Sequence, residues 1–147
     1  MSANSVVTVP AHVLPHRSPG ELLKLARQGL DEAAVTGQDG LRYATAHLAA
    51  LRAAAAVLAA RARPAVGQRN RVTSVWALLT RVAPDLGEWA SFFATGAAKR
   101  AAAEAGISRM VSARDADDLL RAAEQFTEVV EIALDLPHQP TLVPVAA

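Results

Sequence analysis

The segment from Asp39 to Pro64 limits the possible folds of this chain more than any other part of it. The segment is rich in alanine, Asp39 can cap its start, and Pro64 ends it. We predict a single helix there, about 24 residues and about 36 Å long. Its apolar residues form two stripes: Tyr43, His47, Ala50, Ala54 and Val57, and Leu48, Leu51, Ala55 and Leu58. A helix that is apolar on most of its sides is expected at the centre of a bundle.

A strong helix-start signal precedes this central helix. Ser18 can act as the cap, Pro19 suits the first helical position, and Glu21 can complete a capping box. The helix that begins here is predicted to reach Thr36, because Gly37 is typical of a helix end.

Helix signals also follow the central helix. Thr73 or Ser74 can start a short helix that stops before Pro84, and a fourth helix is then predicted as far as Gly106. Ser112 can cap a last helix. Its apolar residues are spaced by four, three, four and three positions, and they are Leu119, Ala123, Phe126, Val130 and Ala133.

Together these signals predict an all-α fold, an up-and-down bundle of four long helices plus one short helix. The bundle is expected to occupy residues 18–135 as one domain, in keeping with a chain of 147 residues. Residues 1–17 are expected to form a flexible N-terminal arm and residues 136–147 a flexible C-terminal tail, since both are rich in proline, valine and threonine.

The composition indicates a globular protein of the cytoplasm. Hydrophobic residues make up 52% of the chain and charged residues 20%. The chain has no cysteine, which excludes disulfides and thiolate zinc sites and suits a reducing compartment. The start of the chain has no secretory signal pattern, and the most apolar run, residues 53–60, is shorter than the roughly 18 residues of a membrane span. We therefore expect no contact with a membrane.

Charge is unevenly distributed, although the net charge is only +1. Residues 40–84 contain seven arginines and no acidic residue, whereas residues 85–147 are acidic overall. Such a basic block would attract a phosphate backbone or an acidic protein partner. The residues predicted to bind it are Arg61, Arg63, Arg69, Arg71 and Arg81. Alternatively, the arginines favour the helix dipole and pair with acids of the last helix inside the same fold.

The order of these parts resembles the HEPN family of helical domains (higher eukaryotes and prokaryotes nucleotide-binding). The phrases that carry the resemblance are "ELLKLARQGLDEAAVTG", "YATAHLAALRAAAAVLAA", "SVWALLTRV" and "EWASFFATGAAKRAAAEAG". The resemblance implies a helical bundle, a homodimer, and a link to RNA, DNA or nucleotides. Many HEPN proteins are ribonucleases, and many others are non-catalytic modules that bind RNA or protein.

The ribonuclease motif of that family is an arginine followed, after four to six residues, by a histidine near the start of a late helix. Here the only match is Arg42 with His47, and both lie on the predicted central helix. Five residues along a helix turn the second side chain about 140° away from the first. We therefore interpret His47 as a structural residue and Arg42 as a solvent-exposed one, with catalysis by this pair or a binding role as the alternatives.

The sequence predicts neither a metal site nor a cofactor site. Its histidines are scattered and no glycine-rich phosphate loop is present. Asp115, Asp117 and Asp118 lie in the first turn of the last helix, where acidic residues favour the helix dipole without any metal.

Three hypotheses for function follow. The first is a non-catalytic HEPN-type module that binds nucleic acid or an acidic protein through the basic region at 61–81. The second is a ribonuclease that uses Arg42 and His47. The third is a protein–protein adaptor that does not bind nucleic acid.

Overall fold

Six α-helices make up most of the chain that the computed structural model describes, which is residues 8–10, 16–65 and 74–137. In chain order the elements are β1 (Thr8–Pro10), α1 (Pro19–Ala34), α2 (Asp39–Arg61), β2 (Arg63–Ala65), α3 (Val75–Val82), α4 (Gly87–Thr95), α5 (Ala97–Glu104) and α6 (Ala113–Ala133), with 3₁₀ turns at Pro84–Leu86 and Ser108–Met110. The predicted all-α class is confirmed.

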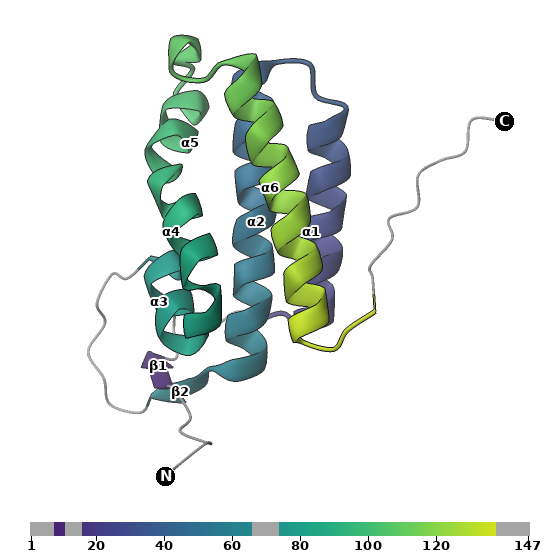
Figure 1. Ribbon diagram of the computed structural model, residues 1–147, viewed down its shortest axis with the longest axis vertical. Helices are drawn as coiled ribbons and strands as arrows, with labels where there is room; N and C mark the ends of the chain where they lie inside the picture. Colours follow the sequence, from purple (N-terminus) through teal and green to yellow (C-terminus); the bar gives the residue numbers. More distant parts are fainter. Residues whose placement is uncertain (1–7, 11–15, 66–73, 138–147) are drawn as a thin grey trace, which may run out of the picture.

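The central position predicted for residues 39–64 belongs to α2. Figure 1 shows α1 and α6 along one side of α2, and α3, α4 and α5 along the other. Alanines supply much of the buried surface of α2, and Ala46, Ala49, Ala50, Ala53, Ala54 and Ala56 are fully buried. By length and composition alone α2 could cross a membrane, but 61% of its most apolar window is buried inside the bundle. Most apolar residues of α2 thus serve the core, whereas Leu41 and Leu48 are exposed.

The predicted caps are present at three helix starts. The Ser18 hydroxyl accepts a hydrogen bond from the Glu21 amide, and the Glu21 carboxylate accepts one from the Ser18 amide. Ser112 and Asp115 make the same reciprocal pair at α6. At α3 the cap is Ser74, rather than Thr73. Each cap satisfies amide groups that have no partner within the helix.

Several helix boundaries differ from the sequence prediction, and α1 ends at Ala34, two residues before Thr36. Gln38 occupies the cap position of α2 without a side-chain hydrogen bond, and Asp39 is the first helical residue. The predicted fourth helix is divided at Gly96 into α4 and α5. A Cβ atom at Gly96 would lie 2.6 Å from the Tyr43 hydroxyl oxygen, so glycine permits the junction to approach α2 closely.

A short parallel pairing, which the sequence did not predict, joins two distant segments. β1 pairs with β2 so that Thr8 lies opposite Arg63 and Pro10 opposite Ala65. This places three residues of the N-terminal arm beside the end of α2. The flexibility of the arm and of the tail stays a prediction, and most of both lies outside the described residues.

Aromatic side chains from three helices meet in the core. Trp76 of α3 stacks on Phe93 of α4 with ring centroids 5.1 Å apart, and Phe126 of α6 lies 5.2 Å from Phe93. The apolar stripe predicted for the last helix is confirmed, because Leu119, Ala123, Phe126 and Val130 are buried. Ala133 is partly buried.

Candidate functional site

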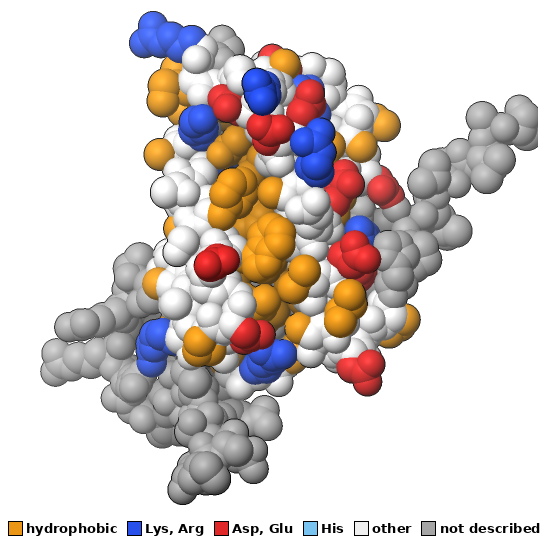
Figure 2. Space-filling view, in the orientation of Figure 1, with side chains coloured by type: hydrophobic (Ala, Val, Ile, Leu, Met, Phe, Trp, Pro, Cys, Tyr) orange, Lys and Arg blue, Asp and Glu red, His pale blue; other side chains and the backbone are white. Residues whose placement is uncertain are grey.

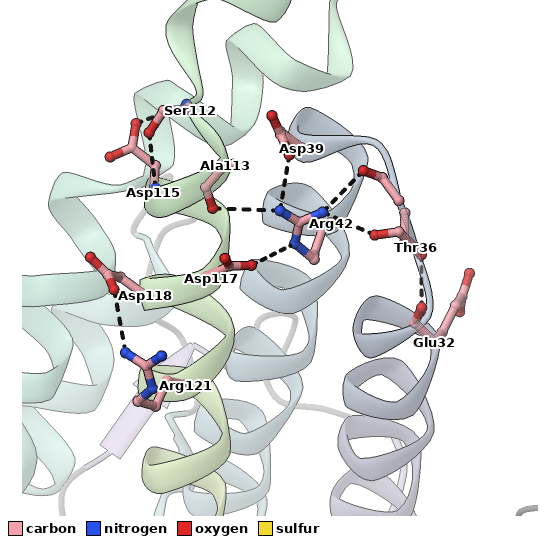
Figure 3. A network of polar contacts seen from close by, with 11 residues as sticks. Glu32, Thr36, Asp39, Arg42, Ser112, Ala113, Asp115, Asp117, Asp118 and Arg121 are labelled. Carbon is pink, nitrogen blue, oxygen red and sulfur yellow. Dashed lines mark hydrogen bonds and ion pairs between the residues drawn. The ribbon is translucent and has the colours of Figure 1, made fainter.

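Arg42 lies on the first turn of α2 and is almost fully enclosed. Its guanidinium donates five hydrogen bonds, which Figure 3 shows. The acceptors are the carbonyl oxygens of Thr36 at 3.0 Å, Gly37 at 3.2 Å and Ala113 at 3.4 Å, and the carboxylates of Asp39 at 2.9 Å and Asp117 at 3.1 Å. Arg42 therefore ties the turn between α1 and α2 to the first turn of α6.

This environment corrects the interpretation of Arg42 as a solvent-exposed side chain. Its relative exposure is only 9%, because Asp39 and Asp117 compensate its charge from two sides. The pair with Asp117 also confirms that one arginine of the basic block pairs with an acid of the last helix. A guanidinium with all its donors engaged has no free group to offer a substrate.

His47 lies one turn further along α2 and is fully buried. Its Nε2 is 2.8 Å from the carbonyl oxygen of Phe93, and its Nδ1 is 3.4 Å from Nη1 of Arg100. A carbonyl can only accept, so Nε2 carries the proton and donates to Phe93. In the neutral ring Nδ1 is then the acceptor for Arg100.

Burial is the main cause that lowers the pKa of His47 below its ordinary value, and the nearby Arg100 lowers it further. The hydrogen bond to Phe93, which is the second-largest cause, and the smaller effect of the Glu104 charge raise the pKa but do not outweigh burial. The ring is enclosed by Tyr43, Trp76 and Phe93. These contacts agree with the interpretation of His47 as a structural residue of the core.

Arg42 and His47, the two residues that match the ribonuclease motif, do not form one site. Arg42 bonds to the α1–α2 turn and to α6, whereas His47 bonds to α4 and α5. This divergence follows from the predicted angle of about 140° between them on one helix.

The basic region at 61–81 is described only in part. Arg61 donates to the carbonyl oxygen of Ala133, at the end of α6, and lies 3.8 Å from Asp85, with a third of its side chain exposed. Arg81 is exposed on the last turn of α3, and it makes no hydrogen bond or ion pair to any other described residue.

The other three predicted binding residues have no described side chain. Arg63 lies in β2, where only its backbone is described, and Arg69 and Arg71 lie outside the described residues. Within the described part, the basic block is interrupted in space by acids from elsewhere in the chain, such as Asp85 beside Arg61. The geometry therefore leaves Arg81 as the most accessible described cation of the five.

A groove that the sequence reasoning missed runs between the α4–α5 column and α6. Figure 2 shows a band of hydrophobic side chains down this face, with charged side chains above it and along one margin. The cavity in the groove has a volume of about 340 Å³, and its lining includes Tyr43, Phe92, Lys99, Asp115 and Leu119. Phe92 is 48% exposed, which is unusual for a phenylalanine next to a core.

Two further contacts could not be predicted from the sequence, because their partners lie far apart along the chain. Arg100 reaches His47 across 53 positions of sequence, and Arg27 forms a part-buried ion pair with Glu131 across 104. A single sequence carries no signal for pairs so far apart. Phe92 gave no such signal either, because it lies three positions after Trp89 and so on the same side of the helix, where a buried side chain is expected.

Comparison with known proteins gives one match. The model of the SAV_6107-like HEPN family matches residues 33–131, which is more than half of the chain. The matched range includes Arg42, His47, the groove and the whole basic region. No curated protein and no solved structure matches the chain significantly.

Proposed function

Because the chain belongs to the SAV_6107-like HEPN family, we propose that it is a non-catalytic HEPN-type module that binds nucleic acid through its basic region at 61–81. The proposal includes a cytoplasmic location, which is supported by the absence of cysteine from the sequence. Cell fractionation with an antibody against the native protein tests this location.

One observation carries the non-catalytic part of the proposal. Arg42 and His47 are the only residues with the spacing of the family's nuclease motif. Both side chains are buried, and both form hydrogen bonds to other residues of the chain. A histidine that acts as a general acid or base must reach the proton that it transfers. The late helix, α6, starts with Ala113 and Arg114 and contains no histidine.

The binding part is supported by where the described arginines lie. Arg61 is in the last turn of α2 and Arg81 in the last turn of α3. The Arg61–Asp85 pair connects the ends of these two helices, because Asp85 follows α3 directly. The sequence between these helices adds Arg63, Arg69 and Arg71 to the same part of the chain. Arginine side chains grouped in this way suit phosphate groups.

The test is the binding of a labelled single-stranded RNA, measured by fluorescence anisotropy across a salt series. We expect Arg69→Ser with Arg71→Ser to weaken binding and to lower the slope of log Kd against log salt by about 0.7 for each phosphate of the single strand that the variant no longer neutralises. The matched control is Arg114→Ser with Arg121→Ser, which removes two exposed arginines from α6. Equal losses of affinity in both double variants would refute a specific role for the 61–81 region.

The same samples, run on a gel, decide between the other hypotheses. We expect intact RNA. If the wild-type protein shortens the RNA and a folded His47→Gln variant leaves it intact, the ribonuclease hypothesis is established instead. No binding at low salt would leave an acidic protein partner or an adaptor role.

We also propose that the protein is a homodimer that buries the groove beside Phe92. Lys99 and Asp115 at the groove already pair with each other, so the surface that a copy related by a two-fold axis would cover is the apolar band that exposes Phe92. We expect Phe92→Asp to give monomers in sedimentation equilibrium, whereas Ile132→Asp, an exposed site on α6, does not. A wild-type protein that is monomeric at micromolar concentration would overturn this proposal.

A further inference from the structure

Helix α5 is attached to the bundle differently from its neighbours. All of its residues are described, and none of them is buried. Glycines lie at both of its ends, where Gly96 separates it from α4 and Gly106 follows it with a φ of +82°. A helix without a core residue, between two glycines, costs little to detach.

Among the described residues, three side-chain contacts link α5 to α2 and α6. The Ala103 methyl group packs against Gly40 of α2, where a glycine permits the close approach. Lys99 forms an ion pair of 3.3 Å with Asp115 of α6, and this pair is partly exposed, so it contributes little. The third contact is the hydrogen bond from Arg100 to His47, and it is the one that reaches into the core.

The third contact depends on the protonation state of His47. Its Nε2 already donates to the carbonyl oxygen of Phe93, so an added proton can only go to Nδ1. Nδ1 then stops accepting from Arg100 and becomes a donor on a cation, 3.4 Å from another cation. The other partner of Arg100 among the described residues is Glu104 of α5 itself, 3.6 Å from Nε, so the bond to His47 is its polar contact with the rest of the described fold.

We propose that α5 is a flap, held closed on α2 by the contact between neutral His47 and Arg100, and that protonation of His47 releases it about Gly96 and Gly106. The released flap uncovers the side of α2 that carries Gly40, Tyr43 and His47.

The contact between His47 and Arg100 is called the latch below. The other groups around His47 do not replace it. From α2 the Tyr43 phenol stacks on the ring, and α3 and α4 present Trp76 and Phe93, which do not titrate. From α5 the only carboxylate is Glu104, which lies 3.6 Å from Nε of Arg100 and moves with the flap.

The pKa directions agree with this geometry. Burial and Arg100 lower the pKa of His47, so the closed state resists protonation, whereas the opened state would titrate near the ordinary value. The pKa of Asp115 is held below its usual range, first by the amide of Ser112, so the pair with Lys99 stays charged while His47 titrates.

The test is amide hydrogen exchange of the whole protein, followed by mass spectrometry and corrected for the intrinsic effect of pH. Below about pH 6.5 the population with α5 open should rise about tenfold for each pH unit, until the pKa of the closed state is reached. Peptides of α1 and α6 are expected to keep their protection. Constant protection of α5, or its loss together with α1 and α6, would overturn the proposal.

Two variants assign the effect to the latch. In His47→Gln the side-chain amide can still donate to Phe93 but does not titrate, so the pH dependence of α5 should disappear. Arg100→Gln removes the cation, so the pKa of His47 is less depressed and the change with pH should be smaller. Lys99→Gln is the matched control, because it removes the contact with α6 and should leave the pH dependence unchanged. An unchanged pH dependence in Arg100→Gln refutes the latch even where His47→Gln does not fold.

Discussion

At the scale of single residues, Arg42 joins two segments that are far apart in the sequence, the α1–α2 connection and the start of α6. Its donors reach the turn after α1, the start of α2 and the first turn of α6. Removal of the guanidinium would leave two backbone carbonyls at the turn without this partner. Hydrogen bonds to charged groups contribute more to stability than neutral ones do.

We expect Arg42→Met to lower the free energy of unfolding by about 2 kcal/mol. Arg42→Lys should recover only part of this loss, because an ammonium group cannot reach five acceptors in a plane. The measurement is urea unfolding followed by circular dichroism. Arg52→Met is the control, since Arg52 lies on the same helix and has no hydrogen bond or ion pair with another described residue. Equal losses in both variants would contradict the role given to Arg42.

Local residue roles could be predicted from the sequence, whereas distant ones could not. Ser18, Ser74 and Ser112 cap helices within three positions of themselves, so their partners can be identified in the sequence. The prediction that Arg42 is exposed to solvent was wrong, because its partner Asp117 lies 75 positions away and could not be identified from the sequence. For the candidate site, the location of His47 on the core stripe was predicted, and its contact with Arg100 was not.

At the scale of secondary-structure elements, the start of α6 combines a cap with an ion pair. Asp115 accepts from the Ser112 amide and pairs with Lys99 of α5. The amide hydrogen bond is the largest cause that lowers the pKa of Asp115 below its ordinary value, and Lys99 lowers it further. A carboxylate with a lowered folded-state pKa stabilises the fold above its unfolded value, and this contribution disappears as pH falls through the folded value.

We therefore expect Asp115→Asn to be less stable than the wild type at pH 7. Below the ordinary carboxyl pKa of about 4 the difference should shrink, because the wild-type side chain becomes neutral as well. Thermal melting of both proteins between pH 7 and pH 2.5 measures this difference. Asp135→Asn, at an exposed position after α6, is the control. If the difference in melting temperature stays constant across this pH range, the charge of Asp115 does not contribute to stability.

The elements that were not predicted are only weakly indicated by the residues around them in the sequence. Gly96 is surrounded by alanine and other good helix formers, and only its approach to Tyr43 shows why the helix divides there. β1 and β2 have three residues each, which is too short for an alternating pattern to be recognised. The long helices were predictable because their apolar period extends over several turns.

At the scale of the whole molecule, the bundle is held together by small side chains on its central helix. Gly29 of α1 approaches Ala49 of α2 so closely that an added Cβ atom would lie 3.2 Å from the alanine Cβ. Close helices give α2 many neighbours but leave no room for longer side chains. This packing makes the contact between α1 and α2 intolerant of added volume.

We expect Ala49→Leu to destabilise the bundle by about 3 kcal/mol, at the upper end of overpacking costs. Ala98→Leu adds the same atoms at an exposed position of α5 and should change stability little. Differential scanning calorimetry of the two variants measures the contrast. A stable Ala49→Leu variant would mean that α1 and α2 can move apart.

The position of α6 in the chain also determines when the core can form during synthesis. α6 packs on both α1 and α2, and its Phe126 completes the aromatic cluster with Trp76 and Phe93. A ribosome needs about 1–4 s for the 21 residues of this helix. During that time α1 and α2 lack the surface of α6 that covers them, so we expect buried alanines of α2 to stay exposed until α6 has docked.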